Sequence, residues 1–477
     1  MKKSEQFCNQ HLSLILGLYI LAQPLLDLLT ALGTERGAAV TVGTVARVLF
    51  LCFALAVTLT APRYRGRGWI LAALAATAAY FVVFFALLLA AGGPELCREN
   101  LRDAGKTLYV PAVAALLVTA RRAYGARIPD WSVAGAGGLY AFLVFLAVLT
   151  GTSGHSYRTG FGYKGWFYAA NEVSCILAIA GPTALWWFAG RLSGACRRWI
   201  LRLAAALALV SVAFCASYLG TKIVFAVLVA YTVLAFVWLL VDCIRKKRGA
   251  AKAVVMGGVM LLTLLLFVTS PLNAYLDNIY FARMGLSSEE IAEAWQSAPT
   301  DAAEGVEVGV NETAAAAAVA SEGTWLRALI AEKPVLQKLD KILSRRLLNA
   351  APAVEEYRNA PLSRKLFGIG YANAPCYARR IDFMIELDGL SLLIRHGVVG
   401  LALFFLPYAA AAVWLIVGFF RNAGKLLGSL RRCTMLYSAL AAFAISCMAG
   451  HVLTAPAVGI FMLAVTALAL EPPKKDS

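Results

Sequence analysis

Residues 201–240 read LRLAAALALVSVAFCASYLGTKIVFAVLVAYTVLAFVWLL, two apolar runs joined by a short turn. Each run has about 20 residues, the length that an α-helix needs to cross the hydrocarbon core of a bilayer. The same pattern recurs along most of the chain and predicts about twelve transmembrane helices. Their expected ranges are 11–32, 39–60, 69–93, 104–120, 131–151, 165–190, 200–219, 222–242, 253–273, 397–420, 433–450 and 453–470.

The composition agrees with this pattern. Of the 477 residues, 60% are hydrophobic and 15% are charged, whereas soluble domains average about 45–50% apolar and about 25% charged residues. These values exclude an ordinary soluble domain, a disordered chain and a fibrous repeat. The predicted fold class is an all-α polytopic integral membrane protein.

The net charge of +17 is concentrated in short segments between the apolar runs. Loops rich in Lys and Arg are typical of the cytoplasmic side of a membrane. Basic clusters follow every second predicted span, at Arg63/Arg65/Arg67, Arg121/Arg122/Arg127, Arg191/Arg197/Arg198/Arg202, Arg245/Lys246/Lys247/Arg248/Lys252 and Arg421/Lys425/Arg431/Arg432. We therefore expect these loops and both termini in the cytoplasm, and no nucleic-acid partner. Lys2 and Lys3 precede a long first span that lacks a signal-peptide cleavage site and should be retained.

One connection is much longer than the others. Residues 1–273 hold the first nine predicted helices, 274–388 form a large extracytoplasmic loop, and 389–477 hold the last three helices and a short cytoplasmic tail. Loops of this length are functional or disordered. Within it, Ala302–Gly323 has the composition of a low-complexity tether, and Trp325–Asn349 is predicted to be an amphipathic helix.

The sequence carries no metal or cofactor motif. The four histidines, His11, His155, His396 and His451, are far apart, and none has a zinc-ligand spacing. Neither a nucleotide-binding Gly-Lys loop nor a dinucleotide glycine pattern is present. We therefore predict no metal and no cofactor, so that the energy for any reaction comes from the substrate or from an ion gradient.

Ionisable residues near the outer boundary are the candidates for chemistry. Arg158 and Lys164 lead into the span predicted at 165–190, and Asn171 and Glu172 lie about a turn and a half inside it. A charged glutamate facing lipid would cost a few kcal/mol. Glu172 is therefore expected to face the bundle interior, either as a hydrogen-bond partner between helices or as a substrate contact.

Lys222 stands at the tight turn Ser217–Lys222, close to the start of the following span. The free backbone N–H groups and the dipole of a helix N-terminus favour an anion there. This position predicts phosphate binding by Lys222. The alternative is a lysine that reaches the lipid headgroups.

The segment at the end of the long loop contains both acids and bases. Arg379 and Arg380 precede Glu386 and Asp388, and Arg395 follows. Carboxylates crowded next to arginines can act as a general base beside a phosphate clamp, and structural salt bridges would explain the same residues.

A second pair of charges lies in the first two spans. Asp27 and Arg47 are each expected near the middle of the membrane, where opposite charges on neighbouring helices pair. A role at the floor of a headgroup cavity is the alternative.

Several short motifs resemble the bacterial O-antigen ligase and O-antigen polymerase family. Gly165-Trp-Phe-Tyr-Ala-Ala-Asn171 is similar to that family's Gly-x-Phe-x-x-x-Asn, and Thr221-Lys222 stands where the family commonly has Ser-Arg. Leu366-Phe-Gly-Ile-Gly370 and Gly397-Val-Val-Gly400 resemble its Gly-x-Gly and Gly-x-x-Gly elements. Gln23–Thr30 and Ala449–Pro456 look like a branch of the family common in Gram-positive bacteria.

The resemblance implies a GT-C-like fold in the bacterial plasma membrane and a metal-independent, inverting glycosyltransferase. Its donor would be a glycan on a polyprenyl diphosphate, its acceptor a hydroxyl on the outer face, and its product a cell-surface polysaccharide. Eleven residues before Gly397 the family has a histidine, whereas this chain has Glu386, the hypothetical base. The cations expected to hold the diphosphate are Lys222, Arg379, Arg380, Arg158 and Arg395.

Two other classes of protein share some of these features. A transporter or flippase for lipid-linked glycans would have a similar helix count and cationic cavity, but it should show a repeat of its two halves. No such repeat is present in the sequence. A non-catalytic scaffold that binds cell-wall polymer would tolerate replacement of the clustered charges.

Overall fold

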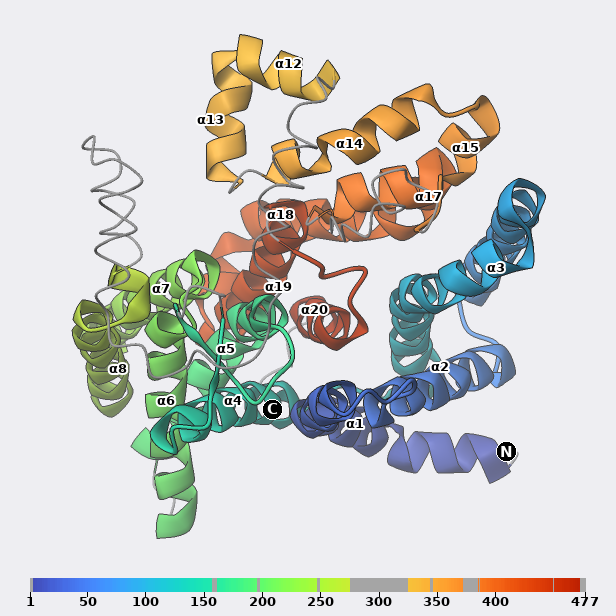
Figure 1. Cartoon of the computed structure of the whole chain (residues 1–477). Coiled ribbons are helices and arrows are strands. Elements are labelled where there is room, and N and C mark those ends of the chain that lie inside the picture. The colour runs from blue at the N-terminus through green and yellow to red at the C-terminus, as the bar shows by residue number, and fades with distance from the viewer. Residues whose placement is uncertain are drawn as a thin grey trace.

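The computed structural model confirms the predicted fold class: the chain is a bundle of helices (Figure 1). It describes residues 3–156, 161–194, 198–246, 249–274, 325–343, 346–371, 385, 387–448 and 450–471. Of the predicted site residues, four lie outside this part of the chain: Arg158, Arg379, Arg380 and Glu386.

Eight helices within the described ranges are long and apolar enough to cross a membrane. They are α1 (Lys3–Glu35), α2 (Val42–Thr60), α3 (Arg67–Tyr124), α4 (Asp130–Leu149), α5 (Ala170–Ser193), α6 (Trp199–Tyr218), α7 (Lys222–Lys246) and α8 (Ala250–Val268). A ninth candidate is the pair α17 (Asp388–Phe404) and α18 (Leu406–Leu427), bent by 45° at Phe405. Helices α19 (Leu430–Met448) and α20 (Pro456–Ala469) follow.

Helix α3 holds two of the predicted spans. Its 58 residues break at Gly93, where φ is 74°, and Pro94 follows at once. Beyond the break the chain turns back. This follows from a contact between the two ends of the helix: the Tyr64 hydroxyl, just before α3, lies 2.8 Å from the hydroxyl of Thr119, near the end of α3. With the two arms of α3 counted separately, each of the twelve predicted apolar segments is helical over most of its described residues.

The prediction for the sixth segment was wrong at its start. The expected span begins at residue 165, but α5 begins at Ala170, because β1 (Gly154–His155) and β2 (Tyr163–Gly165) pair as a small antiparallel hairpin. Gly165 has a φ of 66°, and a Cβ there would lie 2.9 Å from the Val144 Cα. Asn171 and Glu172 are consequently in the first turn of α5 rather than a turn and a half inside a helix.

This hairpin packs against the turn between α6 and α7. The Ser156 hydroxyl donates a hydrogen bond of 2.8 Å to the Leu219 carbonyl oxygen. Gly162 approaches the same turn so closely that a Cβ on it would lie 2.5 Å from that oxygen. Two stretches that the sequence singled out separately, 155–172 and 217–222, therefore meet at one end of the bundle.

The long loop contains α12 (Trp325–Glu332), α13 (Pro334–Ile342), α14 (Arg346–Asn359) and α15 (Leu362–Phe367). The single helix predicted at 325–349 was therefore wrong. Pro334 lacks a backbone N–H and so starts a new helix rather than continuing α12. The predicted tether at 302–323 lies outside the described residues.

The loop helices gather on one side of the bundle, next to α17 (Figure 1). Arg364 in α15 donates a hydrogen bond of 2.9 Å to the Leu87 carbonyl oxygen in α3. Within the loop, the guanidinium of Arg358 lies 5.1 Å from the centre of the Trp325 ring, which joins α14 to α12.

The stability of the loop should depend on pH through Glu356 in α14. Burial of one carboxylate oxygen without a hydrogen-bond partner raises the pKa of Glu356 from 4.5 to about 7. Since the folded state holds the proton more tightly than the unfolded state, the stabilisation is complete below pH 4.5 and is lost as pH rises through 7. We expect limited proteolysis of the loop to be faster at pH 8 than at pH 5.5.

Glu356→Gln should abolish most of this difference in cleavage rate, and Glu332→Gln, at an exposed site in α12, should preserve it. Equal rates at the two pH values in the wild type would contradict the prediction.

Candidate functional site at the end of the bundle

The candidate site is built around the short segment that follows α15. Gly368-Ile-Gly370 runs beside α17, with the Ile369 N–H donating to the Ile394 carbonyl at 3.0 Å and the Gly370 N–H to the Arg395 carbonyl at 3.1 Å. This close approach requires glycine on both sides. A Cβ on Gly397 would lie 2.4 Å from the Leu366 carbonyl oxygen, and its φ is 69°.

Gly397→Ala should therefore destabilise the protein by about 3 kcal/mol, from backbone strain and the clash together. The measurement is the thermal unfolding midpoint in detergent. Gly258→Ala in α8, where nothing lies within 4 Å of the added Cβ, is the matched control and should not lower the midpoint. Equal midpoints for the two variants would show that the close approach is not required.

Tyr371 follows this segment and is held from two sides. Its N–H donates to the Asn100 Oδ1 at 2.7 Å, and the guanidinium of Arg395 lies 4.2 Å from the centre of its ring. Burial raises the pKa of Tyr371 and the neighbouring Arg395 lowers it. The cation–π contact fixes the orientation of Arg395, which is 7% exposed.

A second cation lies close by on α3. Lys106 forms an ion pair of 2.7 Å with Asp103, and Asp103 interacts electrostatically with Tyr371. The site thus combines the buried guanidinium of Arg395 with the half-buried ammonium of Lys106, and Asp103 lies beside them.

His396 holds α17 against both arms of α3. Its Nδ1 lies 2.9 Å from the Tyr80 hydroxyl, and its Nε2 lies 3.1 Å from the Thr107 hydroxyl. The ring is fully buried and both nitrogens have partners. These contacts fix the turn of α17 that carries Arg395 against α3.

The predicted pair Asp27–Arg47 is confirmed. The Tyr140 hydroxyl also donates a hydrogen bond to Asp27, and Arg47 donates to the Gln23 Oε1 at 3.4 Å. The position of Arg47 along its helix can be given from the structure. Arg47 is five residues after the start of α2 at Val42, which is about 8 Å along the helix.

Glu172 connects the Asp27–Arg47 pair with Lys106, which lies near Arg395 and Tyr371. It interacts electrostatically with Asp27, Arg47 and Lys106. Its side chain keeps accessible surface although it lies among these helices. Lys106, Glu172, Asp27 and Arg47 are therefore connected through Glu172, and we call this group the charged line.

The remaining predicted residues flank this line. Lys222 is the first residue of α7 and is exposed. The preceding Thr221 donates a hydrogen bond of 2.8 Å to Ser174 in α5, one turn after Asn171. Lys164 donates to the Tyr168 carbonyl at 3.1 Å, within the connection that leads to α5.

Asp388 is fully buried and accepts four hydrogen bonds. The donors are the N–H groups of Val452 and Leu453, at 2.8 and 2.9 Å, and the hydroxyls of Ser446 and Thr454, at 2.9 and 3.2 Å. All four belong to the end of α19 or to the connection to α20. These contacts anchor the start of α17 to that connection.

Sequence reasoning missed the residues that complete the site: Tyr80, Asn100, Asp103, Lys106, Thr107 and Tyr371. The charged stretch from Arg98 to Lys106 at the predicted start of the fourth span was the available signal. In the part of the chain that the structure describes, no three His, Cys, Asp or Glu side chains are grouped as metal ligands.

A family model described as O-antigen ligase like membrane protein matches residues 9–471. No curated protein matches the chain at a significant level. The match covers nearly the whole chain and includes every residue of the site, and it supports a glycan-ligating role in a membrane. The chain belongs to the family of O-antigen ligase like membrane proteins.

Proposed function

We propose that the protein is a glycosyltransferase that transfers or polymerises glycan from a polyprenyl-diphosphate carrier onto an acceptor hydroxyl at the outer face of the bacterial plasma membrane. The observation that supports it best is the buried Arg395, fixed over Tyr371 next to Lys106 and the charged line. Fixed cations in a site of this kind can stabilise the charge of a departing diphosphate.

The site lies at the end of the bundle away from the basic clusters. Lys106 and Arg121 are on the same arm of α3 and are fifteen residues apart, about 22 Å along the helix. Loops rich in Lys and Arg favour the cytoplasmic side. We therefore place both termini in the cytoplasm and the site near the outer surface.

In the proposed reaction the acceptor oxygen forms a bond to the anomeric carbon, on the face opposite to the leaving group. The bond from that carbon to the diphosphate oxygen breaks, and the lipid diphosphate leaves with the electron pair, so the anomeric configuration inverts. The acceptor proton passes to a carboxylate base, for which we propose Glu386. No nucleotide or metal enters the scheme.

The other residues would bind and position the substrates. Arg395 and Lys222 would contact the diphosphate, together with Arg158, Arg379 and Arg380. Asn171, Glu172 and Lys164 would contact the glycan, and Arg47 would form the floor of the site. The loop helices α12 to α15 would lie beside the acceptor.

A turnover assay tests this function. Purified protein in liposomes is supplied with polyprenyl-diphosphate oligosaccharide, and carrier release and glycan length are followed, with and without a chelator. We expect release by the wild type in both conditions, strong loss in Lys222→Ala and Glu386→Gln, and no loss in the control Lys252→Ala at the opposite end of the bundle. NMR of the product gives its anomeric configuration.

Two results would contradict the proposal. Movement of labelled lipid between leaflets without carrier release would indicate a transporter. Full activity of Glu386→Gln would remove that residue as the base while leaving the transferase assignment intact.

A further inference from the structure

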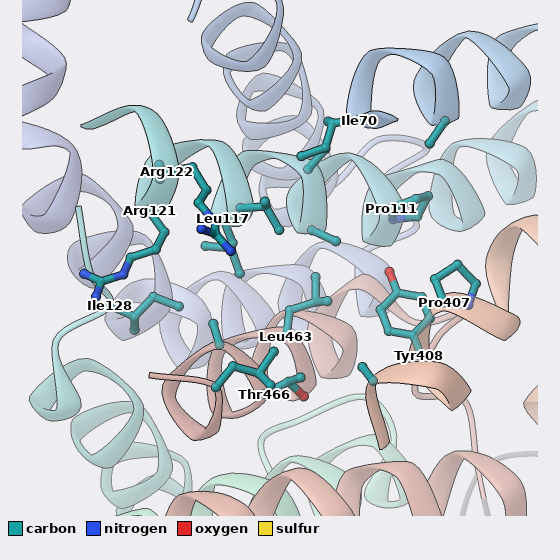
Figure 2. Close-up of a pocket in the computed structure, with 18 of the residues that line it drawn as sticks. Ile70, Pro111, Leu117, Arg121, Arg122, Ile128, Pro407, Tyr408, Leu463 and Thr466 are labelled. Carbon is teal, nitrogen blue, oxygen red and sulfur yellow. The ribbon is translucent and has the colours of Figure 1, made fainter. Parts of the chain in front are cut away.

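A large pocket lies between α3, α18 and α20 (Figure 2). Its volume is about 980 Å³, at the upper end of the range for ligand pockets. Its walls are mostly apolar and include Ile70, Leu117, Ile128 and Leu463. None of the residues of the charged line contributes to it.

The pocket has a basic end. Arg121 and Arg122, in the last turn of α3, line it together with Arg127 just beyond. Figure 2 shows Arg121 and Arg122 together at one end of the pocket and Pro407 and Tyr408 at the other. A ligand that spans the pocket would meet positive charge at one end and apolar side chains along most of its length.

Glu471 also lines the pocket, and both Glu471 and Asp130 are paired with Arg431. Arg431 binds Asp130 at 2.6 Å and Glu471 at 3.2 Å. Among the described residues, no carboxylate forms an ion pair with Arg121, Arg122 or Arg127. Three positive charges thus remain at the mouth of an apolar pocket, which is complementary to an amphipathic molecule with an anionic head.

We propose that this pocket binds an anionic diacyl phospholipid, with its phosphate at Arg121 and Arg122 and an acyl chain along the apolar wall. The leaflet is the one on the side of the basic clusters, which is the cytoplasmic leaflet by the positive-inside rule. The bound lipid would bridge both arms of α3 to α18 and α20 and would stabilise their packing.

A phospholipid fits this pocket better than the glycan carrier does. The arginines lie about 22 Å along α3 from Lys106, so a carrier whose diphosphate is at the proposed transfer site would bring only its uncharged chain here. An uncharged chain leaves the three arginines without an anion. The preference for a phospholipid over the carrier thus rests on the proposed transfer site, whereas the charge and the apolar walls of the pocket do not.

Lipid binding is tested on the delipidated full-length protein in detergent. Phosphatidylglycerol and phosphatidylcholine with identical chains are titrated while the thermal midpoint is recorded, and native mass spectrometry counts the bound lipids. We expect phosphatidylglycerol to raise the midpoint and to bind at least tenfold more tightly than phosphatidylcholine. This comparison needs no variant.

Two double variants locate the effect. Arg121→Gln/Arg122→Gln should lose the tenfold preference, and Arg63→Gln/Arg65→Gln, which removes the same charge from exposed positions outside the pocket, should keep it. Ala467→Trp should reduce binding by filling the apolar wall. Four results would each overturn the proposal. The midpoint could respond equally to the two lipids, or inorganic phosphate could raise it as much as phosphatidylglycerol does. The control variant could lose the lipid preference, or a polyprenyl lipid could co-purify in a way that depends on Arg121 and Arg122.

Discussion

Under the proposed function, replacing Arg395 with alanine is expected to lower the rate of glycan transfer about a hundredfold or more. The loss of one preorganised charge that stabilises a developing anion has effects of this size. Arg395 is buried, and its guanidinium is fixed 4.2 Å above the Tyr371 ring, so no mobile surface cation can replace it. The measurement is carrier release per enzyme molecule at saturating donor, with the thermal midpoint recorded in parallel.

Two further variants sharpen this experiment. Arg358→Ala removes an arginine with a similar ring contact, 5.1 Å from Trp325, but in the loop, and it should retain activity. Arg395→Lys keeps the charge and loses the planar, stacked group, so it should recover only part of the rate. Wild-type turnover by Arg395→Ala with an unchanged midpoint would exclude Arg395 from the reaction.

Asp388→Ala is expected to destabilise the protein by about 3 kcal/mol or more. The substitution leaves two backbone N–H groups and two hydroxyls, all directed at a buried carboxylate, without their acceptor. Each buried donor left unsatisfied costs about 1–3 kcal/mol, although the contributions are not additive. The thermal midpoint in detergent should fall, and the loop between α19 and α20 should become sensitive to protease.

Asp388→Asn separates stability from chemistry. Three of the four hydrogen bonds go to Oδ2, so an asparagine with its carbonyl oxygen at that position keeps them, and its NH₂ group can donate to the Thr454 hydroxyl. We expect a nearly normal midpoint and normal transfer. A stable but inactive Asp388→Asn protein would instead support the hypothesis, drawn from the sequence, that Asp388 takes part in catalysis.

The bundle could be predicted because membrane insertion depends on length and hydropathy, which are local properties of the sequence. The pairing of Asp27 with Arg47 followed from the same reasoning, since an unpaired charge in a span is costly. The hairpin at 154–165 could not be predicted in this way. It depends on positive φ angles at Gly162 and Gly165 and on close approaches to Leu219 and Val144, which apolar runs do not reveal.

The site was predictable only in part. Lys222, Glu172 and Arg395 were singled out as candidates because a charge near the end of an apolar run is easy to recognise in the sequence. Tyr371 and Lys106 were missed, because their roles come from contacts across the chain. The Asn100 side chain that holds Tyr371 is 271 residues away in sequence, and no local spacing encodes such a pair.

The hydrogen bonds of Asp388 also impose an order on biogenesis. The first of its partners in sequence, Ser446, is 58 residues further along the chain, and at 5–20 residues per second its synthesis follows by roughly 3 to 12 s. During that interval the carboxylate has none of its four final donors. The long loop therefore leaves the ribosome before the start of α17 can be anchored. That anchoring requires the end of α19 and the connection to α20, which are synthesised last.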